Sequence, residues 1–248
     1  MIKNLLVFQA VFFFIVACSF AANPFDQFNN ALSGVPSSVA QQNLDNFAKD
    51  FGILLGGGSY HQAKVLGFPG LDIGIHVPTI KTSDENTIVK ASNIDYMFLP
   101  ILQAEVGLPA KFDLIGRFVS YENSTLIGGG VRYGIIKSAL PIIPNVSAQV
   151  IYTQFEANVG LNKFKADDIG VNALASFDLP VITPYVGIGY NSVNVIPDSS
   201  ITNLTSKVNI VRIEGGINLA LLPATYLQIG ANLIDDRIGY VLGLGAKF

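Results

Sequence analysis

The chain has 248 residues, of which 50% are apolar and only 13% are charged, and its mean hydropathy is +0.45. This value is high for a soluble domain of such length. The formal net charge is −3 and the chain contains no cluster of Lys or Arg. Composition and charge therefore argue against a nucleic-acid partner.

The first 22 residues have the pattern of a secretory signal peptide. Lys3 precedes an apolar run over residues 5–17, and small residues at 19–22 supply a cleavage context. The run is shorter than the roughly 20 apolar residues that a transmembrane helix needs. Cys18, the only cysteine, also fits a lipoprotein cleavage box, so lipidation at Cys18 stays open as an alternative. Cleavage at Ala21 or Ala22 would leave no cysteine for a disulfide.

The N-terminal segment, residues 23–58, contains one amphipathic helix. Apolar residues recur at helical spacing over residues 39–55, and Leu44, Phe47, Phe51 and Leu55 form the stripe expected to pack. Ser38 and Gln41 predict a capping box, and three glycines at 56–58 predict the helix end.

The rest of the chain, residues 59–248, is dominated by period-two alternation. Ten segments place their larger apolar residues on one parity: 71–77, 102–108, 112–118, 127–135, 146–152, 169–179, 186–190, 211–219, 227–233 and 238–248. Alternating segments of about ten residues are typical of a membrane β-barrel. The prediction is a single-domain, all-β, antiparallel transmembrane barrel of ten strands, with eight or twelve as neighbouring possibilities. Residues 59–67 stay open as an extra strand, a linker, or chain folded into the lumen.

The final segment alternates large and small residues and stops at Phe248. It resembles the closing strand of bacterial outer-membrane barrels, in which the terminal aromatic residue forms part of the assembly signal. Tyr240 and Phe248 are the corresponding residues here, whereas Ala246 is smaller than that signal usually has. The resemblance implies outer-membrane lipid and the barrel-assembly machinery as partners. The closing strand is expected to pair with the first, near residues 71–78.

Two kinds of link between the segments predict the orientation. Short Pro-containing turns lie at 108–110, 139–141, 179–181 and 222–224, whereas more polar links lie at 81–95, 122–124, 157–165, 197–206 and 235–236. Short turns face the periplasm and longer loops face outward in bacterial barrels. The stripe of the N-terminal helix is expected to pack against the inside of the barrel or its periplasmic mouth.

The inward parity carries charges of both signs, which predicts a lumen charge network. Its members are Asp72, His76, Glu105, Asp113, Arg117, Arg132, Asp168, Asp178, Arg212, Glu214, Arg237 and Lys247. Interleaved Arg and carboxylate groups can satisfy one another across a narrow lumen. Arg117, Arg132 and Arg212 are each expected to reach a lumen carboxylate. The alternative is a narrow path for a small solute or ion, lined by these arginines and Glu214.

The sequence offers little support for catalysis. His61 and His76 are the only histidines, and neither lies in a recognisable Ser/His/acid spacing. The chain lacks a metal-ligand cluster, and the glycine run at 128–130 lacks the Lys-Ser/Thr of a phosphate loop. We therefore predict no catalytic residue, no metal and no cofactor.

Residues 99–109, continuing to Arg117 and Phe118, and residues 130–137 resemble an uncharacterised, porin-like family of outer-membrane barrels from diderm bacteria. The shared pattern spans residues 67–152 and consists of strand and turn features. The resemblance implies an outer-membrane location and carries no catalytic residue. The function favoured at this point is a non-enzymatic envelope protein, either structural or a narrow, plugged pore. The alternatives are a lipid-modifying barrel enzyme and a surface adhesin; the oligomeric state is left open.

Overall fold

The computed structural model describes residues 27–121, 123–138, 140–159, 162–235 and 237–248. The predicted signal peptide at 1–22, with Cys18, lies outside these residues. The described helices are α2 (Phe28–Leu32), α3 (Ser37–Gly56), α4 (Thr87–Lys90) and the 3-10 turn η1 (Pro109–Lys111). The strands are β1 (Leu71–Lys81), β2 (Tyr96–Phe98), β3 (Ile101–Gly107), β4 (Phe112–Tyr121), β5 (Ser124–Ile136), β6 (Asn145–Val159), β7 (Asn162–Ser176), β8 (Ile182–Pro197), β9 (Ser206–Leu222), β10 (Thr225–Ile234) and β11 (Arg237–Lys247).

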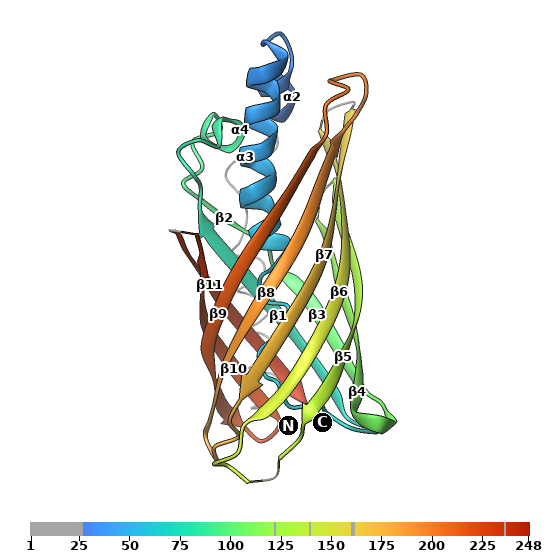
Figure 1. The fold of residues 1–248 in the computed structure, drawn as a ribbon, viewed down its shortest axis with the longest axis vertical. Coiled ribbons are helices and arrows are strands. Elements are labelled where there is room, and N and C mark those ends of the chain that lie inside the picture. The colour runs from blue at the N-terminus through green and yellow to red at the C-terminus, as the bar shows by residue number, and fades with distance from the viewer. Residues whose placement is uncertain (1–26, 122, 139, 160–161, 236) are drawn as a thin grey trace, which may run out of the picture.

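The strands close into a barrel (Figure 1). Within the described residues, β1 and β3 to β11 form a wall of ten antiparallel strands, each paired with its neighbour in sequence. The seam joins β11 to β1, from Asp72 opposite Lys247 to Ile80 opposite Gly239. The short β2 continues the line of β3 along β1 and is separated from it by Leu99 and Pro100. The predicted ten-strand barrel and its closing pair are confirmed.

Across the half of the wall nearest the Pro-containing turns, apolar side chains face outward and polar side chains face the lumen. Exposed outward residues include Leu114, Val131, Val150, Val171, Ile188, Ile213, Ile229 and Leu242. Buried inward residues include Gln103, Asp113, Arg132, Gln149, Asn172, Arg212 and Gln228. This is the reverse of a soluble protein and matches a wall whose outside contacts hydrocarbon.

The pattern inverts further along β6 to β9, toward the long loops. On β6 the outward residues change from Val150 and Tyr152 to Gln154 and Glu156, while the inward residue Phe155 is buried. On β8 the inward Val193 and Val195 are buried, and on β7 Lys163 and Lys165 face outward. A polar outside over an apolar inside requires water outside. The inversion therefore marks one edge of the lipid band, at the level of Tyr152, Ile169, Tyr190 and Val211.

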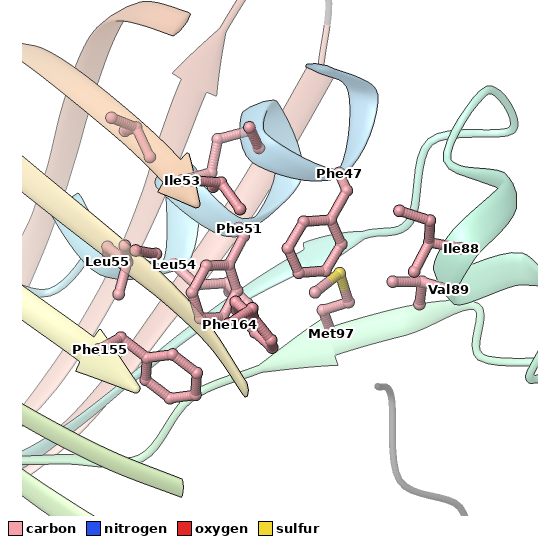
Figure 2. Packing of buried hydrophobic residues seen from close by; sticks show 14 of the residues in the cluster. Phe47, Phe51, Ile53, Leu54, Leu55, Ile88, Val89, Met97, Phe155 and Phe164 are labelled. Carbon is pink, nitrogen blue, oxygen red and sulfur yellow. The ribbon is translucent and has the colours of Figure 1, made fainter. Parts of the chain in front are cut away.

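Helix α3 fills the apolar interior of this projecting wall. Phe51 packs against Phe155 and Phe164, with ring centroids 4.8 and 6.0 Å apart, and Phe47 lies 5.5 Å from Phe51. Figure 2 shows Ile88 and Val89, both of α4, and Met97 of β2 facing the same cluster. All of these side chains are buried. In the described part of the chain no helix has both the length and the hydropathy that crossing a bilayer requires.

Two expectations, the capping box of α3 and the loop at 157–165, are wrong, and a third is confirmed in part. Helix α3 begins after Pro36 without a side-chain cap, because Gln41 instead donates to Asp45 Oδ1 and to the carbonyl of Thr205. The stripe of α3 is buried against the inside of the wall, which is one of the two expected placements, but at the mouth bearing the long loops rather than the one bearing the Pro-containing turns. Most of the predicted loop 157–165 is strand, since β6 runs to Val159 and β7 begins at Asn162. The outward charges of this stretch favoured a loop in the sequence, although its inward residue Phe164 is apolar and buried.

The inversion predicts how arginine is tolerated along the outer face. Ala173→Arg places a cation within the apolar band and should cost about 2–4 kcal/mol of folding free energy. Asn209→Arg, beyond the edge of that band, should cost about 0–1 kcal/mol. Urea unfolding of both variants in lipid vesicles measures the difference. Equal losses at the two positions would contradict the proposed edge.

Candidate functional site in the barrel lumen

The lumen is occupied by residues 57–66, which we call the lumen segment. It descends from the end of α3 toward the Pro-containing turns, where β1 starts (Figure 1). Gly58 lies beside His76 of β1, His61 contacts Asp72 near the start of the same strand, and Leu66 reaches Asp113 at the start of β4. Of the three possibilities left open for residues 59–67, the structure shows chain inside the lumen.

The wall holds the main chain of the lumen segment with polar side chains. Gln103 of β3 and Gln149 of β6 both donate to the carbonyl of Ser59, at 3.3 and 3.1 Å. Gln228 of β10 donates to the carbonyl of Tyr60 at 3.1 Å, and Asn218 of β9 donates to that of His61. Further along, the amide of Ala63 donates to Ser176 Oγ at 3.0 Å and that of Leu66 to Asp113 Oδ1 at 3.0 Å. Strands around the barrel thus bind one extended peptide with their side chains. These side chains satisfy the backbone hydrogen-bonding groups of the peptide, which are removed from water.

Arg132 lies at the centre of a buried charge cluster. Its guanidinium binds Glu105 and also Asp113, the latter at 2.8 Å. All three side chains are at most 1% exposed. Arg132 additionally donates to the carbonyl of Gln62 at 3.4 Å, so the same cation binds both the wall and the lumen segment. Two carboxylates on one guanidinium compensate a charge that would be costly alone.

The other two lumen arginines have different partners. Arg212 Nε lies 3.6 Å from Glu214 Oε2, and its terminal nitrogens donate to Asn191 and Asn172. Arg117 donates to the carbonyls of Leu55 and Gly57 and to Thr153 Oγ1, and no ion pair between Arg117 and a described carboxylate is present within 4.0 Å. The expectation of a carboxylate partner for Arg117 is therefore wrong. The last carbonyls of a helix lack intrahelical donors and carry partial negative charge, so a cation satisfies them instead.

The remaining predicted network residues divide by height in the barrel. Asp72, His76, Asp168 and Glu214 are buried in the lumen, and Asp168 accepts from Asn191 at 2.8 Å. Asp178 and Lys247 lie at the turn end, half-buried and exposed, where they contact Lys64 and Gln62 Oε1 respectively. Arg237 lies at the loop end and binds the buried Asp50 of α3. These three rim residues attach the wall to the lumen segment or to α3, and they lie away from the central charge cluster.

The two histidines lie together near the turn end. His61 Nε2 is 3.0 Å from Asp72 Oδ2, and its ring stacks on Tyr226 at 4.5 Å and on His76 at 5.4 Å. His76 Nδ1 is 2.6 Å from Gln228 Oε1. A cavity of about 530 Å³ opens beside His61 and is lined by Asn218 and by the 179–181 and 221–224 turns. Among the described residues neither histidine bonds to a Ser or Thr hydroxyl, and no metal-binding group of His, Cys, Asp and Glu is present.

Sequence reasoning missed Gln149 and Asp50. Gln149 has inward parity on β6, between the outward Ala148 and Val150, so the alternation carried a signal for it. Asp50 had none, since an acidic residue on the polar side of a helix is ordinarily solvated. It is fully buried here, where it accepts from Asn86 Nδ2 and from the amide of Ser83 at 2.9 Å.

A closed wall with an apolar band outside, polar side chains inside and short turns at one end defines a bacterial outer-membrane β-barrel. Phe248 lies at the turn end, paired through its main chain with Leu71. The chain belongs to a family of unknown function (DUF6588), whose pattern it matches over residues 86–222, more than half its length. The predicted membership of an uncharacterised barrel family and the predicted outer-membrane location are thereby confirmed.

Solved structures with a similar fold are also barrels. The N-terminal barrel domain of Pseudomonas aeruginosa OprF is 12% identical, with 73% of this chain and 99% of that chain covered and a TM-score of 0.37. The KdgM porin is 9% identical, with coverages of 71% and 99% and a TM-score of 0.39. Ail of Yersinia pestis, solved with the heparin analogue sucrose octasulfate, is 14% identical, with coverages of 72% and 97% and a TM-score of 0.35. No curated protein matches this chain by sequence.

Proposed function

We propose that this protein is a non-enzymatic component of the bacterial envelope, a barrel whose lumen is closed by its own lumen segment. The proposed role is structural, and an open, solute-conducting pore is the competing function. Lipid surrounds the apolar band, and the barrel-assembly machinery would recognise the closing strand with Tyr240 and Phe248. Both aromatic side chains are exposed on the outer side of the wall, 55% and 73% respectively.

The observation that carries the proposal is the carbonyl of Ser59, to which Gln103 and Gln149 both donate. Gln228 donates to the next carbonyl along the segment. The three glutamines belong to strands distributed around the ten-strand wall, yet they reach two adjacent peptide units. At this height the bore is therefore filled by one extended chain and the side chains that hold it. A continuous aqueous path would require those hydrogen bonds to open.

Conductance in planar bilayers tests closure. The wild type should show little steady current, whereas Arg212→Ala should produce a leak. Arg212 bridges Asn191, Asn172 and Glu214 beside the upper end of the lumen segment, so its loss leaves a void and an unpaired carboxylate. Lys165→Ala is the matched control because it removes an exposed pair with Glu156 on the outer face. Large, steady wild-type currents whose ion selectivity alone changes in Arg212→Ala would establish the pore instead.

A surface-binding role is the second candidate, and the order of one long loop favours it. In the 82–95 loop, Ile88 and Val89 are buried against α2 and α3, and Asn86 caps α4 through Val89. Lys90 binds Asp95 at 2.8 Å and lowers the pKa of that exposed carboxyl by hydrogen bonding and charge. The loop thus presents a defined surface beyond the lipid band, as an adhesin requires.

The lipid-modifying enzyme has weaker support. Such an enzyme needs a nucleophile or activated water beside a histidine at the rim. His61, which contacts Asp72, lines the cavity at the turn end, but His61 Nδ1 is buried and has no hydrogen-bond partner in the described structure. A histidine shielded in this way, with no Ser or Thr hydroxyl bonded to it among the described residues, gives no specific observation in favour of catalysis.

A further inference from the structure

The N-terminal segment runs through the barrel in one direction, and the contacts along it are ordered by height. Gln41, near the start of α3, donates to the carbonyl of Thr205 in the β8–β9 loop. Ser206 donates to Asp45 one turn later, and a Cβ at Gly52 would meet Val193 and Ile210. The path thus starts at the long loops and moves inward along β8 and β9.

The descent continues to the opposite mouth. A Cβ at Gly56 would meet Arg212 and Asn191, at the edge of the lipid band, and Gly58 lies beside His76. The chain then reaches Asp113 at Leu66 and turns into β1 at Leu71, next to Phe248. Residues 57–70 in extended form reach at most about 46–50 Å, which exceeds the roughly 30 Å hydrocarbon core. The segment is long enough to connect the two sides of the membrane through the lumen.

The start of α3 lies on the water-exposed side of the inversion. Gln41 contacts Thr205 in the β8–β9 loop, and Asp45 contacts Ser206, the first residue of β9. Both partners lie closer to the long loops than Tyr190 and Val211 do. The mouth with the short Pro-containing links is also where the first strand begins, at Leu71, and where the last strand finishes, beside Phe248. Short links and strand termini face the periplasm in bacterial barrels, which places the long loops outside the cell.

We propose that residues 27–56 are carried across the outer membrane and displayed on the cell surface, so that the barrel exports its own N-terminal segment. There α2 and α3 form, with α4 and the inner faces of β6 to β9, a small folded cap. The lumen admits one extended chain at the height of Ser59, whereas a helix with its side chains is about 10–12 Å wide. Residues 27–56 therefore cross unfolded or are enclosed as β11 pairs with β1, and they fold on the far side. This inference rests on the direction of the chain and does not depend on whether the lumen conducts.

Cysteine labelling on intact cells tests the proposal. Ser38→Cys, at the exposed start of α3, is compared with Asn203→Cys in the exposed β8–β9 loop and Ile142→Cys, 84% exposed in the β5–β6 turn. The probe is a membrane-impermeant maleimide, applied before or after lysis. The wild type sets the background from Cys18, and heat-modifiable mobility shows that each variant has folded. Ser33→Cys, in the exposed link between α2 and α3, replaces Ser38→Cys if that variant does not assemble.

Cells should be labelled at positions 38 and 203 while intact and at position 142 only after lysis. Labelling of position 38 only after lysis, with position 203 accessible beforehand, would overturn the proposal. So would accessibility of position 142 on intact cells with positions 38 and 203 protected, since the barrel would then be inserted the other way round. These outcomes are separate from conductance, because a conducting barrel with the expected labelling would retain the export proposal and refute closure.

Discussion

Arg132→Ala is expected to lower the free energy of unfolding by about 3–5 kcal/mol, or somewhat less where water enters the lumen. The substitution leaves Glu105 and Asp113 buried without their cation and removes the donor to Gln62. Two neighbouring carboxylates cannot both stay ionised there at low cost. Urea unfolding in detergent micelles, followed by circular dichroism, gives the free energy, and heat-modifiable mobility reports assembly.

Two variants make the Arg132 result specific. Lys165→Ala breaks an ion pair with Glu156 in which both side chains are more than 40% exposed, and such pairs contribute about 0–1 kcal/mol. The triple variant Arg132→Met, Glu105→Gln, Asp113→Asn removes all three charges and should recover most of the loss, because no unpaired charge remains. A loss in Arg132→Ala as small as that in Lys165→Ala would show that the cluster is hydrated and contributes little to stability.

The second large effect is expected from Phe51→Ala, which should cost about 3–5 kcal/mol in the stability of the cap. Phe51 is 2% exposed and contacts the rings of Phe47, Phe155 and Phe164, so its loss creates a cavity between α3 and the projecting strands. Because this cluster lies beyond the lipid band, the cap should loosen while the membrane-embedded strands persist. Limited proteolysis within residues 33–43, combined with circular dichroism of the barrel, separates the two parts.

The matched control for Phe51 is Val39→Ala on the same helix. Val39 is 41% exposed, so truncation there should change stability by less than about 0.5 kcal/mol. Faster proteolysis in Phe51→Ala alone is the expected result. Equal protease resistance in Phe51→Ala and the wild type would mean that α3 is held mainly by Arg237, Asp50 and the lumen segment rather than by the aromatic cluster.

Parity in the sequence predicted which side chains face the lumen, but it did not predict their partners. Arg117 and Arg132 share inward parity, and both were expected to bind carboxylates. Arg132 lies at the height of Glu105 and Asp113, whereas Arg117 lies at the height where α3 ends. Height depends on the register between strands and on the chain inside the lumen. Neither quantity can be read from the alternation within one strand.

The projecting wall shows a second limit. Residues 153–158 and 163–168 also alternate, but with the apolar residues on the inward side, and the polar outward residues favoured a loop over 157–165. Apolar inward positions such as Phe155 and Phe164 are stable in water only when another element covers them. That element is α3, more than one hundred residues earlier in the chain. Its contact with these strands is a long-range property.

The sequence by itself determined the barrel, its ten strands, the seam between β1 and β11 and the polar character of the lumen. These features depend on local rules, since side chains alternate along every strand and proline ends a strand where a ladder hydrogen bond is needed. Only the tertiary structure decided which mouth α3 covers, that residues 57–66 pass through the lumen, and how each buried charge is compensated. Those outcomes depend on groups distant in sequence meeting at one height in a closed wall, where most buried polar groups are hydrogen-bonded.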